Sequence, residues 1–341
     1  MVSGVLSPKA SGEFIAKHAG DVSIDENGVK KLAEEIVKAL KSKTLSIDGF
    51  SQHELHPQTV DEAAVQWIFV VDTLNFCFWT ESQREKWEVT FHGKSYTGYF
   101  AWCAAVNRAL EEGIAITDPN YFSKIRSKEL KHILRSDNDG GSVSLVDERV
   151  QCLQQVGKVL LEKYEGTFVN CIKESKQSAQ ALLKLIVDNF SCFKDEAEYK
   201  GKKVSLYKRA QILIGDIWAC FRGKGLGEFK DIDTIVMFAD YRIPQVLVHY
   251  GAMKYSDDLM NKLKSDVLLE NGSNEEVEIR GCSIEAVEQV KDTVLAMLKK
   301  ENITDLLVNS VLIDHYLWDY RRKHADSLEV IPFHKTKSIY Y

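Results

Sequence analysis

Apolar residues recur at helical spacing along most of this chain. Val29, Leu32, Ile36 and Leu40 are three or four positions apart, so they share one face of a helix, and charged residues fill the opposite face. The same spacing recurs in three later stretches, whose apolar positions are Val146, Val150, Leu153, Leu160 and Tyr164, then Leu182, Leu183, Ile186 and Phe190, then Ile284, Val287, Val294, Leu295 and Leu298. The pattern therefore predicts a mainly α-helical protein.

One stretch shows the pattern of a β-hairpin instead. Residues 87–91 alternate between apolar and polar types, and His92 and Gly93 supply a turn before a second strand at residues 94–99. The apolar spacing that follows predicts a helix over residues 100–110. We therefore expect a small β-hairpin or sheet within a mainly α fold.

Two short stretches of turn-forming residues interrupt the helical patterns. Residues 118–120 and 136–142 are both expected to be loops. The second loop is predicted to separate an N-terminal helical part with the β-hairpin, residues 1–140, from a helical part at residues 141–341. Helical patterns on both sides of this loop favour two parts packed as one compact unit.

The composition limits the class of partner. The 341 residues carry 44 basic and 50 acidic side chains, for a formal net charge of −6. A protein that follows a nucleic-acid backbone normally has a basic excess, so a nucleic-acid polymer is not the expected partner. No run reaches the roughly 18 apolar residues of a membrane span, and residues 1–14 lack the apolar core of a signal peptide, so no membrane association is expected.

Cysteine usage bears on metal binding and on the compartment. The seven cysteines are scattered and no two form a C-x-x-C pair, which argues against a structural zinc site. Most of them lie among apolar residues, so buried reduced thiols in a reducing compartment are expected. The expected location is the cytoplasm, with the nucleus as an additional compartment.

Lys208 and Asp240 carry the strongest chemical signal in the sequence. Lys208 opens an apolar helical pattern, and Asp240 stands about thirty residues later, just before a helix with Pro244 in its first turn. The dipole of that helix should keep the carboxylate ionised, and a fixed carboxylate stabilises the positive charge that develops on a sugar during glycosyl transfer. A lysine and an acid in this arrangement resemble the pair of helix-hairpin-helix glycosylases. The alternative is a solvated lysine and a helix-capping aspartate.

A second group of candidates lies near the C-terminus, in residues 314–320. His315 and Asp319 are four positions apart and share a helix face, and Asp314 lies about 100° around the helix from His315. Acids buried in an apolar, aromatic helix are costly unless they bind something. The alternative is an exposed acidic edge beside the basic residues 321–323.

Three further features are less specific. His53 lies in a polar stretch with too few other ligands for zinc, so a hydrogen bond to a bound molecule is the alternative to metal binding. Residues 223–227 resemble a phosphate loop but follow a helical pattern rather than a strand, which predicts a flexible connection. Arg209 and Arg280 are candidate phosphate contacts without a specific signal.

Several longer segments together resemble the queuosine salvage family. They are residues 61–64, 72–79, 207–211, 237–244 and 314–320, with the terminal Tyr340 and Tyr341. The similarity extends over essentially the whole chain and is greatest to the vertebrate members. It implies hydrolysis of queuosine 5′-phosphate to queuine and ribose 5-phosphate, without a metal or cofactor. It also implies a mainly helical fold akin to helix-hairpin-helix DNA glycosylases.

The resemblance assigns roles residue by residue. Lys208 and Asp240 match the catalytic lysine–aspartate pair, and Asp319 is the other candidate for the principal catalytic carboxylate. The positions that match the queuine pocket are His53, Phe238, Asp240, Asp314, His315 and Asp319. This chain has His315 where the family pattern has a tyrosine.

Two other functions remain open on sequence grounds. A base-excision glycosylase acting on DNA or RNA would share the lysine–aspartate pair, although the net charge of −6 opposes it. A non-catalytic queuine-binding protein that assists tRNA modification would share the pocket and show binding without turnover.

Overall fold

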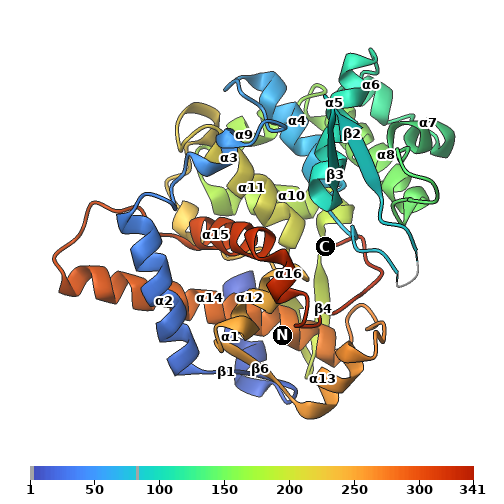
Figure 1. Ribbon diagram of the computed structural model, residues 1–341. Helices are drawn as coiled ribbons and strands as arrows, with labels where there is room; N and C mark the ends of the chain where they lie inside the picture. Colours follow the sequence, from blue (N-terminus) through green and yellow to red (C-terminus); the bar gives the residue numbers. More distant parts are fainter. Residues whose placement is uncertain (1–3, 82–83) are drawn as a thin grey trace. The chain divides into compact units, whose positions relative to one another are not determined.

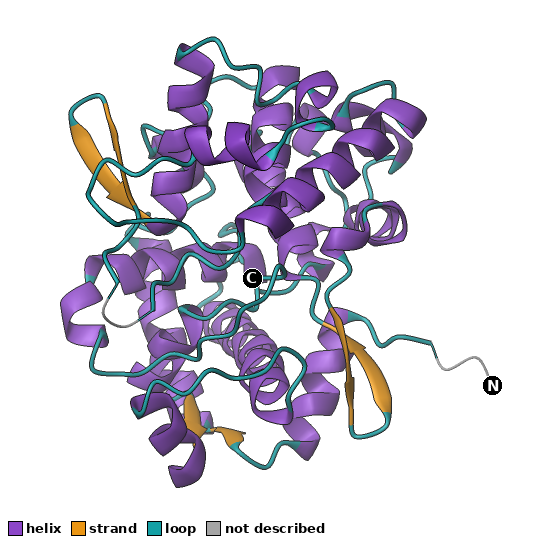
Figure 2. Ribbon diagram, turned by 90° about the vertical axis from the view of Figure 1, so that its right-hand side faces the viewer, coloured by secondary structure: helices purple, strands orange, loops and turns teal. Residues whose placement is uncertain are grey.

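The computed structural model describes residues 4–81 and 84–341, and most of them are in helices (Figures 1 and 2). Within these described residues, the strands form three short antiparallel pairs. The prediction of a mainly α protein with a small β part is confirmed. Two compact units are formed by interleaved segments: unit 1 is Met1–Ile47, Asp195–Gln211 and Ile232–Lys337, and unit 2 is Asp48–Lys194, Ile212–Asp231 and Ser338–Tyr341.

Unit 1 is organised around one long helix. α14 (Asn274–Lys300) packs against α1 (Pro8–His18) and α2 (Glu26–Lys41). α1 and α14 approach closely because glycines face the partner helix: a Cβ on Gly281 would lie only 2.4 Å from a side-chain carbon of Ile15. The remaining elements of unit 1 are β1 (Val22–Ile24), β4 (Glu196–Tyr199), β5 (Lys202–Ser205), η3 (Ile232–Thr234), α12 (Ile243–His249), β6 (Met253–Tyr255), α13 (Asp257–Lys264), α15 (Ser310–Lys323) and α16 (Ala325–Leu328).

Unit 2 contains the predicted hairpin and a second set of packed helices. β2 (Glu88–Phe91) pairs with β3 (Lys94–Thr97) across a turn in which His92 and Gly93 both have positive φ, as a tight two-residue hairpin turn requires. The helices of unit 2 are α3 (Gly49–Gln52), α4 (Glu62–Thr73), α5 (Gly98–Glu111), α6 (Pro119–Phe122), α7 (Ser127–Ile133), α8 (Val146–Lys163), α9 (Phe168–Glu174) and α10 (Ala179–Asn189), with the short η1 (Ser191–Phe193) and η2 (Gly225–Gly227). α11 (Lys208–Cys220) is divided between the units after Gln211.

Most of the predicted elements are confirmed, with corrections at particular positions. The four apolar patterns correspond to α2, α8, α10 and α14. Leu295 was wrongly placed on the buried face: it is 44% exposed, because it follows the buried Val294 and lies about 100° around the helix from it. The loop predicted at residues 118–120 is the start of α6, where the Asp118 carboxylate accepts the N–H of Asn120 and Pro119 fits the first turn.

Other features of the chain bear on the remaining predictions. All seven cysteines are buried, as expected. Residues 223–227 follow α11 and contain η2, so the segment that was expected to be a flexible connection includes one turn of 3-10 helix. The division expected after residue 140 falls inside unit 2 and stays a prediction. Within the described residues, no helix combines the length and apolar character needed to cross a membrane.

Candidate functional site

Lys208 stands at the first position of α11, where a strained turn meets the helix. The turn follows the β4–β5 hairpin, and Tyr207 has a φ of +47°, a conformation that costs a non-glycine residue about 1 kcal/mol or more. Asp195 holds this turn: its backbone oxygen accepts the N–H of Leu206 at 3.0 Å, and its Oδ2 accepts the N–H of Lys208 at 3.1 Å. Lys208 as a whole residue is 5% exposed.

Asp240 ends a buried segment, residues 235–240, that has no regular secondary structure. Buried backbone polar groups need hydrogen-bond partners, and here side chains supply them. Gln211 Oε1 accepts the N–H of Val236 at 3.1 Å, and Asp314 Oδ2 accepts the N–H of Phe238 at 2.9 Å. The carbonyl of Ala239 accepts a hydrogen bond from Arg280 Nε at 2.9 Å. Side chains from α11, α14 and α15 thus fix the segment that carries the acid.

The Asp240 carboxylate itself sits at the start of α12. Its Oδ1 accepts the N–H groups of Arg242 at 2.9 Å and of Ile243 at 2.8 Å, and Pro244 occupies the first turn, as the sequence predicted. The side chain is half-buried. Burial raises the pKa of Asp240 above its ordinary value of 3.8, although the charge of Lys208 and the two N–H groups act to lower it. The expected stabilising effect of the helix start is therefore present, but desolvation outweighs it.

The candidates on α15 differ in their surroundings. Asp314 is buried and bound to the backbone of Phe238, whereas Asp319 is exposed. The rings of Phe238 and His315 have centroids 6.1 Å apart. Desolvation lowers the pKa of His315 to about 4, against the opposing charge of Asp319, so this imidazole is neutral near pH 7. Asp314 therefore fits the prediction of a buried acid that binds another group, and Asp319 fits the alternative of an exposed acid at the helix edge.

His53 belongs to unit 2, whereas the other predicted site residues belong to unit 1. Its ring stacks on Phe100, with centroids 3.6 Å apart and an interplanar angle of 10°. The N–H of Leu55 donates to His53 Nδ1 at 3.3 Å, so a neutral ring carries its proton on Nε2. Within the described residues, no group of three or more His, Cys, Asp or Glu side chains is arranged to hold a metal ion.

Two residues of this site were not identified correctly from the sequence. Arg280, a candidate phosphate contact, is instead 1% exposed and engaged with protein groups. Its Nη1 and Nη2 donate to the two carboxylate oxygens of Asp195 at 3.0 and 2.6 Å, and Nη1 also donates to Glu276 at 3.1 Å. The four-residue spacing of Glu276 and Arg280 could have suggested their ion pair. Nothing in the sequence signals the role of Asp195.

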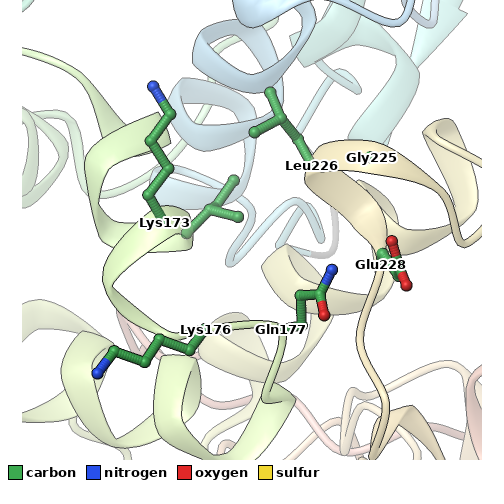
Figure 3. A pocket seen from close by; sticks show the side chains of 7 residues that line it. Lys173, Lys176, Gln177, Gly225, Leu226 and Glu228 are labelled. Atoms are coloured by element: carbon green, nitrogen blue, oxygen red, sulfur yellow. The ribbon is translucent and has the colours of Figure 1, made fainter.

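A small pocket lies in unit 2 (Figure 3). It is lined by Ile172, Lys173, Lys176, Gln177, Gly225, Leu226 and Glu228. Two lysines beside a glycine-containing loop would suit an anion. Figure 3 shows, however, that the side chains of Lys173 and Lys176 extend in different directions, so their ammonium groups do not converge on one point.

Comparison with known proteins identifies the family. The family model described as "Queuosine salvage protein" matches residues 55–341. A Bos taurus protein named queuosine 5′-phosphate N-glycosylase/hydrolase is 50% identical over 100% of both chains. Proteins of the same name are 44% identical in Nematostella vectensis, over 100% of both chains, and 35% identical in Sphaerobacter thermophilus, over 96% of this chain and 95% of the other. The chain therefore belongs to the queuosine salvage protein family.

Proposed function

We propose that this chain hydrolyses the N-glycosidic bond of queuosine 5′-phosphate and so releases queuine for salvage into tRNA modification. The observation that carries the proposal is the pairing of Lys208 with Asp240, in which a lysine at a helix start interacts electrostatically with an acid at the end of a buried segment. Family membership supports the substrate, because relatives aligned over nearly their whole length have this activity in their names.

The reaction needs stabilisation of positive charge on the sugar. The bond between C1′ of the ribosyl phosphate and the base nitrogen breaks, and its electron pair leaves with the base. Positive charge develops on C1′ and the ring oxygen until water adds to C1′, with one water proton transferred to the base. The negative charge of the Asp240 carboxylate, which two backbone N–H groups hold in place, stabilises this developing positive charge. One such electrostatic contact typically stabilises a transition state by about 2.7–4 kcal/mol.

The leaving group makes a fixed carboxylate especially useful. Queuine is a 7-deazaguanine, so no N7 is present to be protonated as the base departs. Catalysis then depends more on the sugar cation and on the position of water. Lys208 contributes because its positive charge lowers the pKa of Asp240 and so opposes the effect of burial on the carboxylate.

Recognition of the base is assigned to residues around α15. The rings of Phe238 and the neutral His315 have centroids 6.1 Å apart, and both are proposed to stack with the base. The exposed Asp319 complements the secondary amine of queuine, which is cationic at neutral pH. Asp314 contributes through its bond to the Phe238 backbone.

The proposal extends to fold type, substrate form and location. The lysine at the start of α11 and the acid before α12 support a helix-hairpin-helix glycosylase-like arrangement. The formal charge of −6 supports a free nucleotide rather than a nucleic-acid polymer as substrate. The burial of all seven cysteines supports a reducing compartment, the cytoplasm with the nucleus in addition.

The proposal is tested with purified protein and queuosine 5′-phosphate. Mass spectrometry should detect free queuine and ribose 5-phosphate in equal amounts, with much slower release of queuine from intact tRNA. Binding of the nucleotide without any product would favour a non-catalytic role. Comparable release from tRNA would favour a polymer-acting glycosylase.

A further inference from the structure

We propose that Asp195 and Arg280 form a positioning pair that fixes Lys208 and Asp240 relative to each other for catalysis. This inference rests on the proposed function, because it assigns to the pair a part in the same reaction. Both residues lie in unit 1, in the same unit as the two groups that they position.

Asp195 holds the lysine. Its Oδ2 accepts the backbone N–H of Lys208 at 3.1 Å, and its backbone oxygen accepts the N–H groups of Leu206 at 3.0 Å and Tyr207 at 3.4 Å. Three successive N–H groups thus converge on one residue. The strained Tyr207 conformation persists because these bonds define the turn.

Arg280 holds the acid and is tied to Asp195 by two parallel hydrogen bonds. Its Nη1 and Nη2 bind the Asp195 carboxylate, with the shorter contact at 2.6 Å, and its Nε donates to the carbonyl of Ala239 at 2.9 Å. Ala239 immediately precedes Asp240. The path from the Lys208 backbone to the Asp240 backbone therefore consists of one carboxylate and one guanidinium, both planar and matched in geometry.

Stability alone does not account for this pair. The side chains are 5% and 2% exposed, and a buried ion pair often contributes no more to stability than apolar residues of similar volume. The pair fixes the relative position of two backbone segments that are far apart in sequence. It contacts one segment at the Lys208 N–H and the other at the carbonyl of Ala239, next to Asp240. A misplacement of 1 Å in such groups can lower a rate by about 10²-fold.

A position effect has a kinetic signature that a folding defect lacks. All three guanidinium nitrogens of Arg280 bind protein groups, so the side chain is directed at the fold rather than at a ligand. Its loss should lower kcat and leave KM nearly unchanged. A phosphate-binding arginine would instead raise KM on substitution.

The test uses Arg280→Lys and Asp195→Asn in the full chain, with steady-state kinetics on queuosine 5′-phosphate and thermal unfolding. Lysine lacks the second parallel hydrogen bond and the Nε donor, and asparagine keeps an acceptor for the Lys208 N–H but loses the charge. Each folded variant should show kcat reduced by about 10²-fold and KM changed by less than about threefold. The control is Lys291→Met, which breaks another buried ion pair of α14, with Glu288. It should lower Tm and leave kcat unchanged.

Combination with Asp240→Asn separates positioning from general damage. If Arg280 acts through Asp240, Arg280→Lys should have little further effect on kcat in the Asp240→Asn background. Full additivity of the two losses, or a kcat for Arg280→Lys and Asp195→Asn equal to that of Lys291→Met at matched Tm, would overturn the inference. Absence of wild-type turnover would overturn the proposed function itself and this inference with it.

Discussion

Replacement of Asp240 by asparagine should abolish most turnover without loss of stability. Asparagine keeps an Oδ1 that accepts the N–H groups of Arg242 and Ile243, so the start of α12 is preserved. It removes the negative charge that opposes the sugar cation. Loss of such an electrostatic contact is typically worth about 2.7–4 kcal/mol, and kcat should fall by about 10²–10³-fold.

The change in stability follows from the direction of the pKa shift. The pKa of Asp240 is raised above 3.8 by burial even with the attraction of Lys208 included, so ionisation is less favourable in the folded chain than in the unfolded one. The ionised carboxylate thus lowers the free energy of unfolding as pH rises through its raised pKa. A difference of one in pKa corresponds to about 1.4 kcal/mol. Asp240→Asn should therefore have a Tm at pH 7 equal to or above that of wild type, with the gain disappearing at acidic pH.

Asp25→Asn is a matched control. Asp25 also accepts two backbone N–H groups at a helix start, from Asn27 and Gly28, and it pairs with Lys254 outside the proposed site. Its pKa is lowered, chiefly by the hydrogen bond from Lys254, so its charge stabilises the fold above pH 3.8. The same substitution there should lower Tm slightly at pH 7 and leave kcat unchanged. Near-normal turnover of Asp240→Asn with an unchanged Tm would refute the reasoning and move the principal role to Asp319.

Three further predictions concern the rest of the site. Lys208→Gln removes the positive charge that lowers the pKa of Asp240, so the acidic limb of the pH profile of kcat/KM should move to higher pH. An acidic limb at the same pH as in wild type would show that Lys208 does not affect the ionisation of Asp240 during catalysis. The pKa of His315 near 4 predicts no titration of its ring between about pH 5.5 and 8 by NMR, and its neutral form should contribute stability that declines as pH falls below about 6.5. Asp319→Asn should shrink the binding preference for queuine over 7-deazaguanine, whereas Asp314→Asn should weaken both ligands alike; an equal loss of preference in both variants would contradict the different roles of the buried and exposed acids.

The sequence by itself determined the helical character of the chain and indicated its candidate catalytic pair. Helices such as α2 and the β2–β3 hairpin follow from periodicity and turn chemistry, which are local properties of neighbouring residues. Lys208 and Asp240 were found because each stands at a helix start, and helix starts have a local signature. Long matching segments, rather than any single motif, indicated the family.

Only the tertiary structure decided which polar residues hold the backbone at Lys208 and next to Asp240. Asp195 and Arg280 are 85 positions apart, and such a contact leaves no periodic trace in one sequence. The spacing of residues along a helix does not show whether a buried Asp314 binds a ligand or the protein backbone. The structure shows that Asp314 accepts the N–H of Phe238. The raised pKa of Asp240 likewise depends on how many groups pack around it, and a local pattern predicts the helix start but not the desolvation that outweighs it.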